Sequence, residues 1–344
     1  MGLFSHRVKQ PRHSKNLRPL PMRIPMPPTF RSSLVNLHHI NFQDFSNSLT
    51  PEEAREPSPA LLDSVARAGI LHPPILREQG RTSMEIVTGR RRLLAAQQTL
   101  HSISTICLVL PADTLPAETL AINLEDTVLR GDISVVEQAI FFQKILAHLD
   151  ENEAAQRFLP VLGLEPHRHH LHSLLPLLRL EEHLLTALHE GRLHEGVARE
   201  LLALNFTDRL SLYEVMEILS LSVSNQKKIT ISCRELAARH NTSVMALLSQ
   251  PEVREILDPQ ETNIPQKTAR LMQWLTEQRF PNLTEAEQEF RAFTAALKLP
   301  NGVALNHSPS FEQDQVHLTI PFTNREALRT TWPLIADALK AHEG

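Results

Sequence analysis

This chain of 344 residues takes its fold from two stretches, Ala68-Gly69-Ile70-Leu71-His72-Pro73-Pro74-Ile75-Leu76-Arg77 and Glu85-Ile86-Val87-Thr88-Gly89-Arg90-Arg91-Arg92-Leu93-Leu94-Ala95-Ala96. The tandem prolines end a helix, because proline disfavours the α region in the residue before it. The residues that follow predict a short strand over 74–77, a turn over 79–81 and a second strand over 84–87. A helix then opens at Arg90.

Gly89 stands between the end of the second strand and the start of that helix. A glycine lets the backbone approach a ligand closely, and the free amides of a helix N-terminus favour anions. Arg90, Arg91 and Arg92 run against the usual preference for acidic residues in a first helical turn. A phosphate-bearing ligand is the most economical explanation, and the alternative is a solvated charged face.

The same residues resemble the amino-terminal domain of the ParB family. Its glycine-aliphatic-aliphatic-polar-proline box corresponds to residues 69–73, and its glycine-acidic-arginine-arginine box corresponds to residues 89–92. A third box lies within residues 122–139, where Asn123 and Arg130 match the family pattern. The resemblance spans residues 35–204. It implies a small mixed-sheet domain that binds CTP with magnesium, a homodimer on DNA, and a partition ATPase as a candidate partner.

Two groups of site residues follow from the resemblance. Asn123 and Asp126 form the candidate metal pair, because hard cations prefer oxygen ligands. The family pattern has an acidic residue at each of two positions where this chain has Ile122 and Arg90. Hydrolysis of a nucleoside triphosphate requires a group that positions water or metal. We therefore expect nucleotide binding with weak or absent hydrolysis. The candidate nucleotide-binding residues are Gly69, Leu71, His72, Pro73, Gly89, Arg90, Arg91, Arg92, Asn123 and Arg130.

The composition restricts the class of protein. Aromatic residues make up only 5% of the chain and glycine contributes only 10 residues, which favours a mostly helical protein with aliphatic cores. Cys107 and Cys233 are the only cysteines, so a disulfide framework and a cysteine zinc site are both unsupported. No apolar run approaches the roughly 18 residues that a membrane span needs, and the first residues lack the apolar core of a signal peptide. We expect a soluble, cytoplasmic, nucleoid-associated protein that does not engage a membrane.

The charge is unevenly distributed along the chain. Residues 1–43 hold seven of the 35 Lys and Arg residues and none of the 39 acids, which leaves 28 basic against 39 acidic side chains, a net charge of −11, on the rest. A basic arm on an acidic body suggests nonspecific contact with polyanions, or only a solvated leader. The fold class expected is α+β. We predict a disordered basic arm over 1–31, a ParB-like nucleotide-binding domain over 32–132, a helical helix-turn-helix region over 133–280 and a small α/β domain over 281–344.

Further elements complete the first domain. We expect a strand over 35–42, a helix from Ser58-Pro59 to Gly69, a central strand over 104–110 and a helix over 117–124. Ser134 and Glu137 then form a capping-box pair for the next helix.

A helix over 151–162, a glycine turn at 163–164 and a helix over 166–178 predict a helix-turn-helix unit. The second helix of such a unit enters the major groove of DNA. Residues 169 and 172 also have the spacing of a metal pair, but no second cluster completes a coordination shell. A solvated face is the remaining interpretation. The candidate DNA-binding residues are His167, Arg168, His169, His170 and His172.

The last third predicts helices from residue 225 and over 267–280, and a helix capped by Thr284 and Glu287 that continues to Leu297. A turn at 300–302, a hairpin of 303–305 with 316–320 and a helix over 324–339 complete the chain. In ParB proteins this region commonly dimerises, so self-association is the expectation here.

The leading hypothesis is a ParB-like, CTP-responsive DNA-binding protein in chromosome or plasmid partition or related DNA organisation. One alternative is a scaffold or transcription regulator on the same fold that has lost hydrolysis. The other alternative is an enzyme on the same fold, such as a nuclease, a kinase-like protein or a sulfiredoxin relative. The arginine box has no cysteine for sulfiredoxin-like chemistry, and the clustered carboxylates that a nuclease needs are not found.

Overall fold

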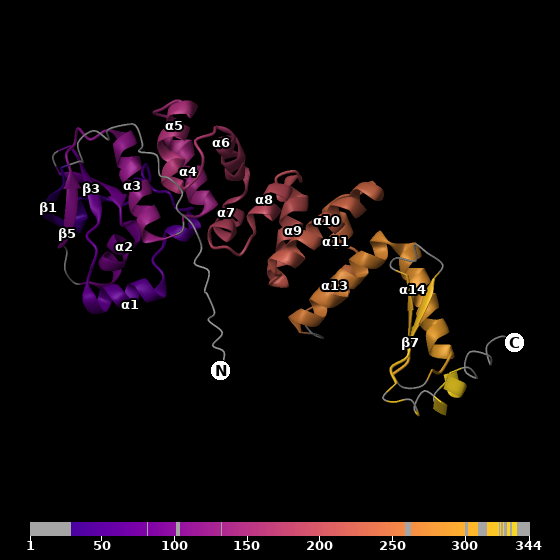
Figure 1. Cartoon of the computed structure of the whole chain (residues 1–344). Coiled ribbons are helices and arrows are strands. Elements are labelled where there is room, and N and C mark those ends of the chain that lie inside the picture. The colour runs from indigo at the N-terminus through magenta and orange to yellow at the C-terminus, as the bar shows by residue number, and fades with distance from the viewer. Residues whose placement is uncertain are drawn as a thin grey trace, which may run out of the picture. The chain divides into compact units, whose positions relative to one another are not determined.

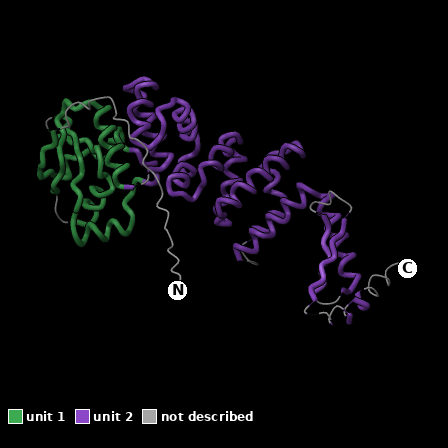
Figure 2. Tube along the Cα trace, viewed as in Figure 1, with its two compact units in different colours: residues 1–48, 55–130 green, residues 49–54, 131–344 purple. Residues whose placement is uncertain are grey.

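The computed structural model describes residues 29–80, 82–100, 104–131, 133–258, 263–299, 302–308, 315–322, 324, 326, 329–330 and 332–335. These residues form two compact units (Figure 2). Unit 1 contains the described residues of 1–48 and 55–130, and unit 2 contains those of 49–54 and 131–344. Except for residues 29–31, the predicted basic arm lies outside the described residues. A five-stranded mixed sheet together with many helices confirms the expected α+β class (Figure 1).

The sheet of unit 1 has the strand order β1-β5-β3-β4-β2. Strands β3 and β4 form an antiparallel hairpin, β5 runs parallel to β3, and β1 pairs antiparallel with β5 at one edge. The predicted turn between β3 and β4 includes Gly80, whose φ of 71° is left-handed. The strands are β1 (Arg31–Asn36), β2 (Ile40–Asn41), β3 (Ile75–Gln79), β4 (Ser83–Thr88) and β5 (Ser104–Leu110).

The single strand predicted over 35–42 is wrong. The chain instead leaves β1 at Asn36, makes the 3-10 turn η1 (Leu37–His39) and re-enters the sheet as β2 beside β4. The Asn36 side chain accepts a hydrogen bond from the backbone amide of His38, at 2.9 Å, and so caps the turn. A short polar side chain that satisfies a local amide competes with the strand ladder.

Helices cover both faces of this sheet. Helices α1 (Pro59–Ala68) and α2 (Arg90–Thr99) pack on the face that presents Leu76, Ile86 and Val109, and the buried side chains there form one apolar core. Ser58 caps α1 and Gly69 ends it, as the sequence predicts. Helix α3 (Pro116–Arg130) covers β4 on the opposite face and continues six residues past the predicted end.

A buried polar network connects α3 to the sheet. Glu85 of β4 is only 2% exposed, and it accepts hydrogen bonds from Arg77 Nε at 2.7 Å and from Asn47 Nδ2 at 2.6 Å. Asn47 in turn accepts a hydrogen bond from the Thr119 hydroxyl of α3 at 2.8 Å. The network therefore holds the loop around Asn47 between the sheet and α3.

Unit 2 begins with α4 (Val135–Ile145), whose Ser134–Glu137 capping box is present as predicted. The two helices predicted for the helix-turn-helix unit are each shorter than expected. The first consists of α5 (Glu151–Phe158) and the 3-10 turn η3 (Pro160–Leu162), and the second of α6 (His169–Leu174) and the 3-10 segment η4 (Leu175–Arg179). Pro160 and Pro176 explain both interruptions, because proline removes a helical hydrogen bond.

A series of helices completes the larger part of unit 2 (Figure 1). The predicted capping box at Thr284 is wrong: α14 already begins at Pro281, and the Thr284 hydroxyl bonds back to the carbonyl of Phe280 inside the helix. The helices are α7 (Glu182–His189), α8 (Glu195–Leu201), α9 (Phe206–Ile218), α10 (Val223–Arg239), α11 (Val244–Leu248), α12 (Pro251–Leu257), α13 (Ile264–Arg279) and α14 (Pro281–Ala296).

The predicted carboxyl-terminal hairpin is confirmed. Strands β6 (Ala304–His307) and β7 (Val316–Thr319) pair antiparallel in a sheet of two strands. Half of the residues of the helix predicted over 324–339 lie outside the described residues, and residues 326, 329–330 and 332–335 are helical, as predicted.

Candidate functional site

The two motifs that open the sequence analysis meet at the start of α2. Gly89 is the N-cap of α2 and has a φ of 87°. A Cβ at this position would lie 2.9 Å from Cβ and 3.1 Å from Cα of Pro74, which is closer than carbon atoms pack. The absence of a side chain therefore lets the proline box lie directly against the start of α2.

Arg92 provides a second connection between the motifs. Its Nη1 donates a hydrogen bond to the carbonyl oxygen of His72. Burial lowers the pKa of Arg92, the Asp126 carboxylate opposes this shift, and the neighbouring Arg130 charge adds to it. Arg92 thus interacts electrostatically with Asp126 and Arg130 of α3 and donates a hydrogen bond to the 69–73 loop.

The charged end of α3 supplies the third part of the site. Arg130 Nε lies 3.3 Å from Asp126 Oδ2, and Arg130 Nη2 donates to the Thr127 hydroxyl at 3.0 Å. Oδ2 of Asp126 is buried and has no hydrogen-bond partner among the described residues. These side chains form a mixed cluster with Arg92, in which two cations face one carboxylate.

Arg91 is the arginine of the box that remains available to a ligand. Its side chain is exposed, and it makes no hydrogen bond or ion pair with any described residue. No side chain caps the start of α2, so the amides of its first turn are also available. Leu71, His72 and Pro73 are exposed beside them. Gly69 ends α1 with a φ of 68°.

Arg90, by contrast, is engaged within unit 1. Its guanidinium donates to the carbonyl of Phe42 at 2.6 Å and to that of Asp44, and it stacks 4.3 Å from the centre of the Phe45 ring. Burial is the main reason that the pKa of Arg90 is lowered, with Arg55 contributing in the same direction. The first arginine of the box therefore anchors the 42–45 loop.

Asn123 is likewise used by the fold. It is 7% exposed, its Nδ2 donates to the carbonyl of Asn47, and its Oδ1 accepts a hydrogen bond from Thr127 at 3.3 Å. Asp126, the other candidate metal ligand, faces Arg130. Within the described ranges no three His, Cys, Asp or Glu side chains converge as a metal-binding group. Both side chains therefore make contacts within unit 1, and their role as a metal pair stays a prediction.

The candidate DNA-binding residues gather at the start of α6. The ring centres of His169 and His170 are 4.0 Å apart, and those of His167 and His169 are 5.8 Å apart. The pKa of His170 is lowered, first by partial burial and then by its two histidine neighbours. Arg168 and His169 are exposed. His172 Nε2 lies 3.1 Å from Glu151 Oε2, so this side chain is shared with α5.

Sequence reasoning missed the pair of Arg77 and Glu85. These residues are direct cross-strand partners in the β3–β4 hairpin. Opposite charges in the two predicted strands, each two residues outside the Gln79–Ser83 pair that flanks the turn, were the available signal. In the described part of the chain, no helix is both long and apolar enough to span a bilayer.

Comparisons with known proteins find similarity to the ParB family. The family model of the ParB HTH domain matches residues 131–235. The chromosome-partitioning protein Spo0J of Thermus thermophilus is 34% identical over 167 residues, which cover 48% of this chain and 58% of the relative. Stage 0 sporulation protein J of Bacillus subtilis is 32% identical over 154 residues, covering 44% and 50%.

A solved structure also matches, that of a C-terminally truncated chromosome-partitioning protein ParB from Caulobacter crescentus complexed with CTP-γ-S. It is 26% identical, and the match covers 50% of this chain and 92% of that chain with a TM-score of 0.24. The chain spans about half of the length of the two curated relatives. Residues 131–235 thus match the ParB HTH domain, and the resemblance of this chain to the ParB family is confirmed.

Proposed function

We propose that this chain is a nucleotide-responsive, ParB-like DNA-binding protein that acts in chromosome or plasmid partition or related DNA organisation. The observation that carries the proposal is the junction at Gly89, where the 69–73 loop, the uncapped start of α2 and the unpaired Arg91 converge. Such an arrangement offers backbone amides and a guanidinium to phosphate oxygens. The identity of the nucleotide, CTP, comes from the resemblance to ParB.

The residues divide between ligand binding and support. Arg91 and the first amides of α2 contact the phosphates, while Arg92 holds the 69–73 loop and supplies a second positive charge. Arg90 positions the 42–45 loop. Among the described residues of the proposed site, the carboxylate of Asp126 is paired with Arg130. We therefore propose nucleotide binding with weak or absent hydrolysis, since hydrolysis needs a group that positions water or metal.

The nucleotide site is tested by titrating the full chain with CTP in the presence of magnesium. Replacing Arg91 with Ala should weaken binding about tenfold or more, because a hydrogen bond to a charged group contributes about 1.5–3 kcal/mol. Calorimetry measures the affinity. Arg67→Ala is the matched control, because Arg67 is an exposed arginine of α1 in the same unit. Equal CTP affinities of the two variants would contradict the role of Arg91 in the site. If the unaltered chain does not bind CTP, the nucleotide site itself is ruled out.

DNA binding is proposed for the exposed side of α6. Arg168 and His169 face solvent at the start of this helix, where a helix-turn-helix unit contacts the major groove. Each phosphate contact that is lost reduces the slope of log affinity against log salt concentration by about one.

Fluorescence anisotropy with a labelled duplex at several salt concentrations measures that slope. Arg168→Ala should make the dependence shallower, whereas Arg254→Ala, an exposed arginine of α12, should leave it unchanged. An identical slope for both variants would place the DNA contact elsewhere. A chain that binds DNA but no nucleotide would instead be a transcription regulator, and a chain that binds neither would be a scaffold.

Self-association is proposed for the carboxyl-terminal part. Helix α14 buries none of its side chains fully, and Phe293 and Val316 are 48% and 54% exposed. A two-stranded hairpin is marginally stable by itself, so β6, β7 and α14 would gain stability by pairing with a second copy. We propose a homodimer, with a partition ATPase as a further partner.

A further inference from the structure

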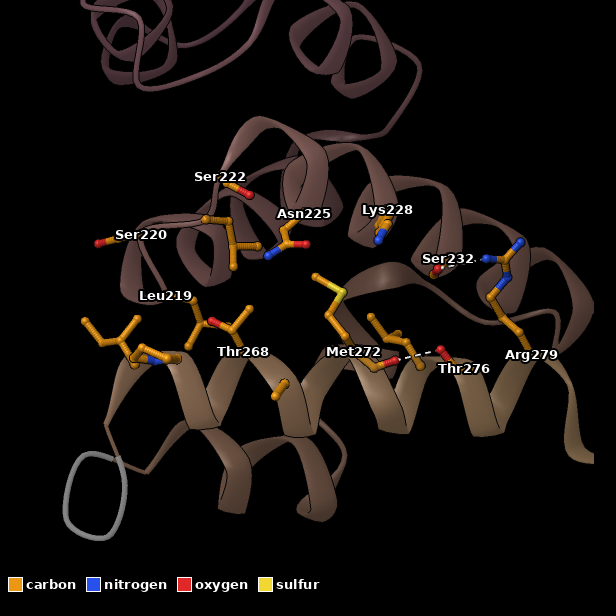
Figure 3. A pocket seen from close by; sticks show the side chains of 15 residues that line it. Leu219, Ser220, Ser222, Asn225, Lys228, Ser232, Thr268, Met272, Thr276 and Arg279 are labelled. Atoms are coloured by element: carbon orange, nitrogen blue, oxygen red, sulfur yellow. Dashed lines mark hydrogen bonds between the residues drawn. The ribbon is translucent and has the colours of Figure 1, made fainter. Parts of the chain in front are cut away.

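A groove of about 780 Å³ runs between α10 and α13 in unit 2 (Figure 3). Asn225 and Lys228 project into it from α10, and Thr268 and Met272 face them from α13 (Figure 3). The volume lies within the range of about 300–1,000 Å³ that is typical of small-molecule sites, which also occur between helices. Only the α10 side falls within residues 131–235, so the ParB HTH domain accounts for one wall and not the other.

The charge of the lining is one-sided. Among the described residues that line the groove, Lys228 and Arg279 are cationic and none is acidic, although the chain as a whole has more acids than bases. Lys228 forms no hydrogen bond or ion pair with any described residue. Arg279 is fixed by Ser232, at 3.2 Å, and by Glu235, while its Nε is buried without a hydrogen-bond partner. This lining favours an anion.

The cationic side chains of the groove lie toward one end, and the other end combines apolar side chains with Ser220 and Ser222 (Figure 3). Lys228, Ser232 and Arg279 lie toward one end, and Leu219 lies toward the other (Figure 3). Ile264, which begins α13, contributes an apolar side chain that is 46% exposed. A groove that presents an exposed isoleucine and an unpaired lysine suits a ligand with an apolar body and a single negative charge. The apolar body is then removed from water, and the negative charge is paired with the ammonium group.

We propose that the groove between α10 and α13 binds a small amphipathic anion, with a phosphate or carboxylate group at Lys228 and an apolar body along Met272 and Ile264. Met272 is half-buried in the middle of the groove, where its flexible thioether adapts to an apolar ligand. The site is separate from the nucleotide site, which lies entirely in unit 1.

Octyl phosphate, at concentrations below those at which it forms micelles, is the probe for this site. Calorimetric titration of the full chain should give saturable binding of one molecule per chain. Inorganic phosphate has the same head group without the apolar body, and octyltrimethylammonium has the same apolar body with the opposite charge. Both should bind at least tenfold more weakly. Equal binding of the two octyl compounds, or binding of many molecules per chain, would overturn the proposal.

Two variants locate the ligand. Lys228→Gln should weaken octyl phosphate binding about tenfold, whereas Lys227→Gln, an adjacent exposed lysine that does not line the groove, should have no effect. Met272→Glu should abolish binding by placing a like charge beside the head group, and circular dichroism checks that the helices are retained. Arg91→Ala should leave octyl phosphate binding unchanged, which separates this site from the nucleotide site. If Lys228→Gln binds like the unaltered chain, the groove is not the site.

Discussion

Replacing Arg77 with Met is expected to destabilise unit 1 by about 3–5 kcal/mol, because it leaves the Glu85 carboxylate buried without its counter-charge. Glu85 is only 2% exposed, and Arg77 donates to it through both Nε and Nη2. The hydrogen bonds from Asn47 and Ser46 remain in the variant, but neither brings a positive charge. Removing one partner of a buried ion pair costs more stability than replacing both partners with apolar residues. Arg77→Met combined with Glu85→Leu should therefore recover part of the lost stability.

Hydrogen exchange of β3 and β4 in the full chain measures this effect, since local stability determines how often these amides open. Tryptophan and tyrosine fluorescence cannot report on unit 1, because Tyr213, Trp274 and Trp332 all belong to unit 2. Arg31→Met is the matched control. Arg31 pairs with Glu78 at 2.7 Å on the same sheet, but these side chains are 66% and 35% exposed, so its loss should cost at most about 1 kcal/mol. Similar protection in the two variants would show that the buried pair is not a principal source of stability.

Replacing Gly89 with Ala is the second change with a large expected effect. A residue other than glycine in the left-handed region costs about 1–3 kcal/mol. At Gly89 the new Cβ would also overlap Pro74 and approach Arg92 Nη2 to 3.0 Å, so the start of α2 must move away from the 69–73 loop. We expect faster hydrogen exchange in α2 together with a loss of CTP affinity of at least tenfold, because the two halves of the proposed site separate.

The variant Gly163→Ala distinguishes the cost of a left-handed backbone from the cost of steric overlap with Pro74. Gly163 has a φ of 72°, close to that of Gly89, but a Cβ there would meet nothing within 4 Å. Its replacement should therefore incur only the cost of the left-handed backbone and should leave CTP affinity unchanged. Should Gly89→Ala bind CTP as tightly as Gly163→Ala does, the contact with Pro74 would be irrelevant to the site.

The sequence by itself determined those features that depend on neighbouring residues. Proline and glycine placed the end of α1 and the hairpin of β3 and β4, and the Ser134–Glu137 pair placed the start of α4. These features were predictable because backbone conformation and capping act over a few residues. The resemblance to ParB was also available from short motifs, and the comparisons confirm it.

The tertiary structure decided how the three arginines are used. Their adjacency in sequence predicted one shared role, but Arg90 contacts the 42–45 loop, Arg92 contacts His72, and Arg91 remains exposed. Consecutive residues of a helix point in directions about 100° apart, since 3.6 residues complete a turn. What each guanidinium contacts therefore depends on the segments that pack around the helix, and the segments that Arg90 and Arg92 contact lie 20 to 48 residues away in the chain.

The buried Glu85–Arg77 pair and the groove between α10 and α13 have the same origin. Asn47 donates to Glu85 from a distant segment, and Thr119 donates in turn to Asn47. Lys228 and Met272 line the groove from separate helices. Burial and charge pairing depend on distances in space, which residue spacing along the chain does not contain. Local propensity therefore determined the end of α1, the β3–β4 hairpin and the start of α4, whereas packing determined which charges are neutralised and which remain available to a ligand.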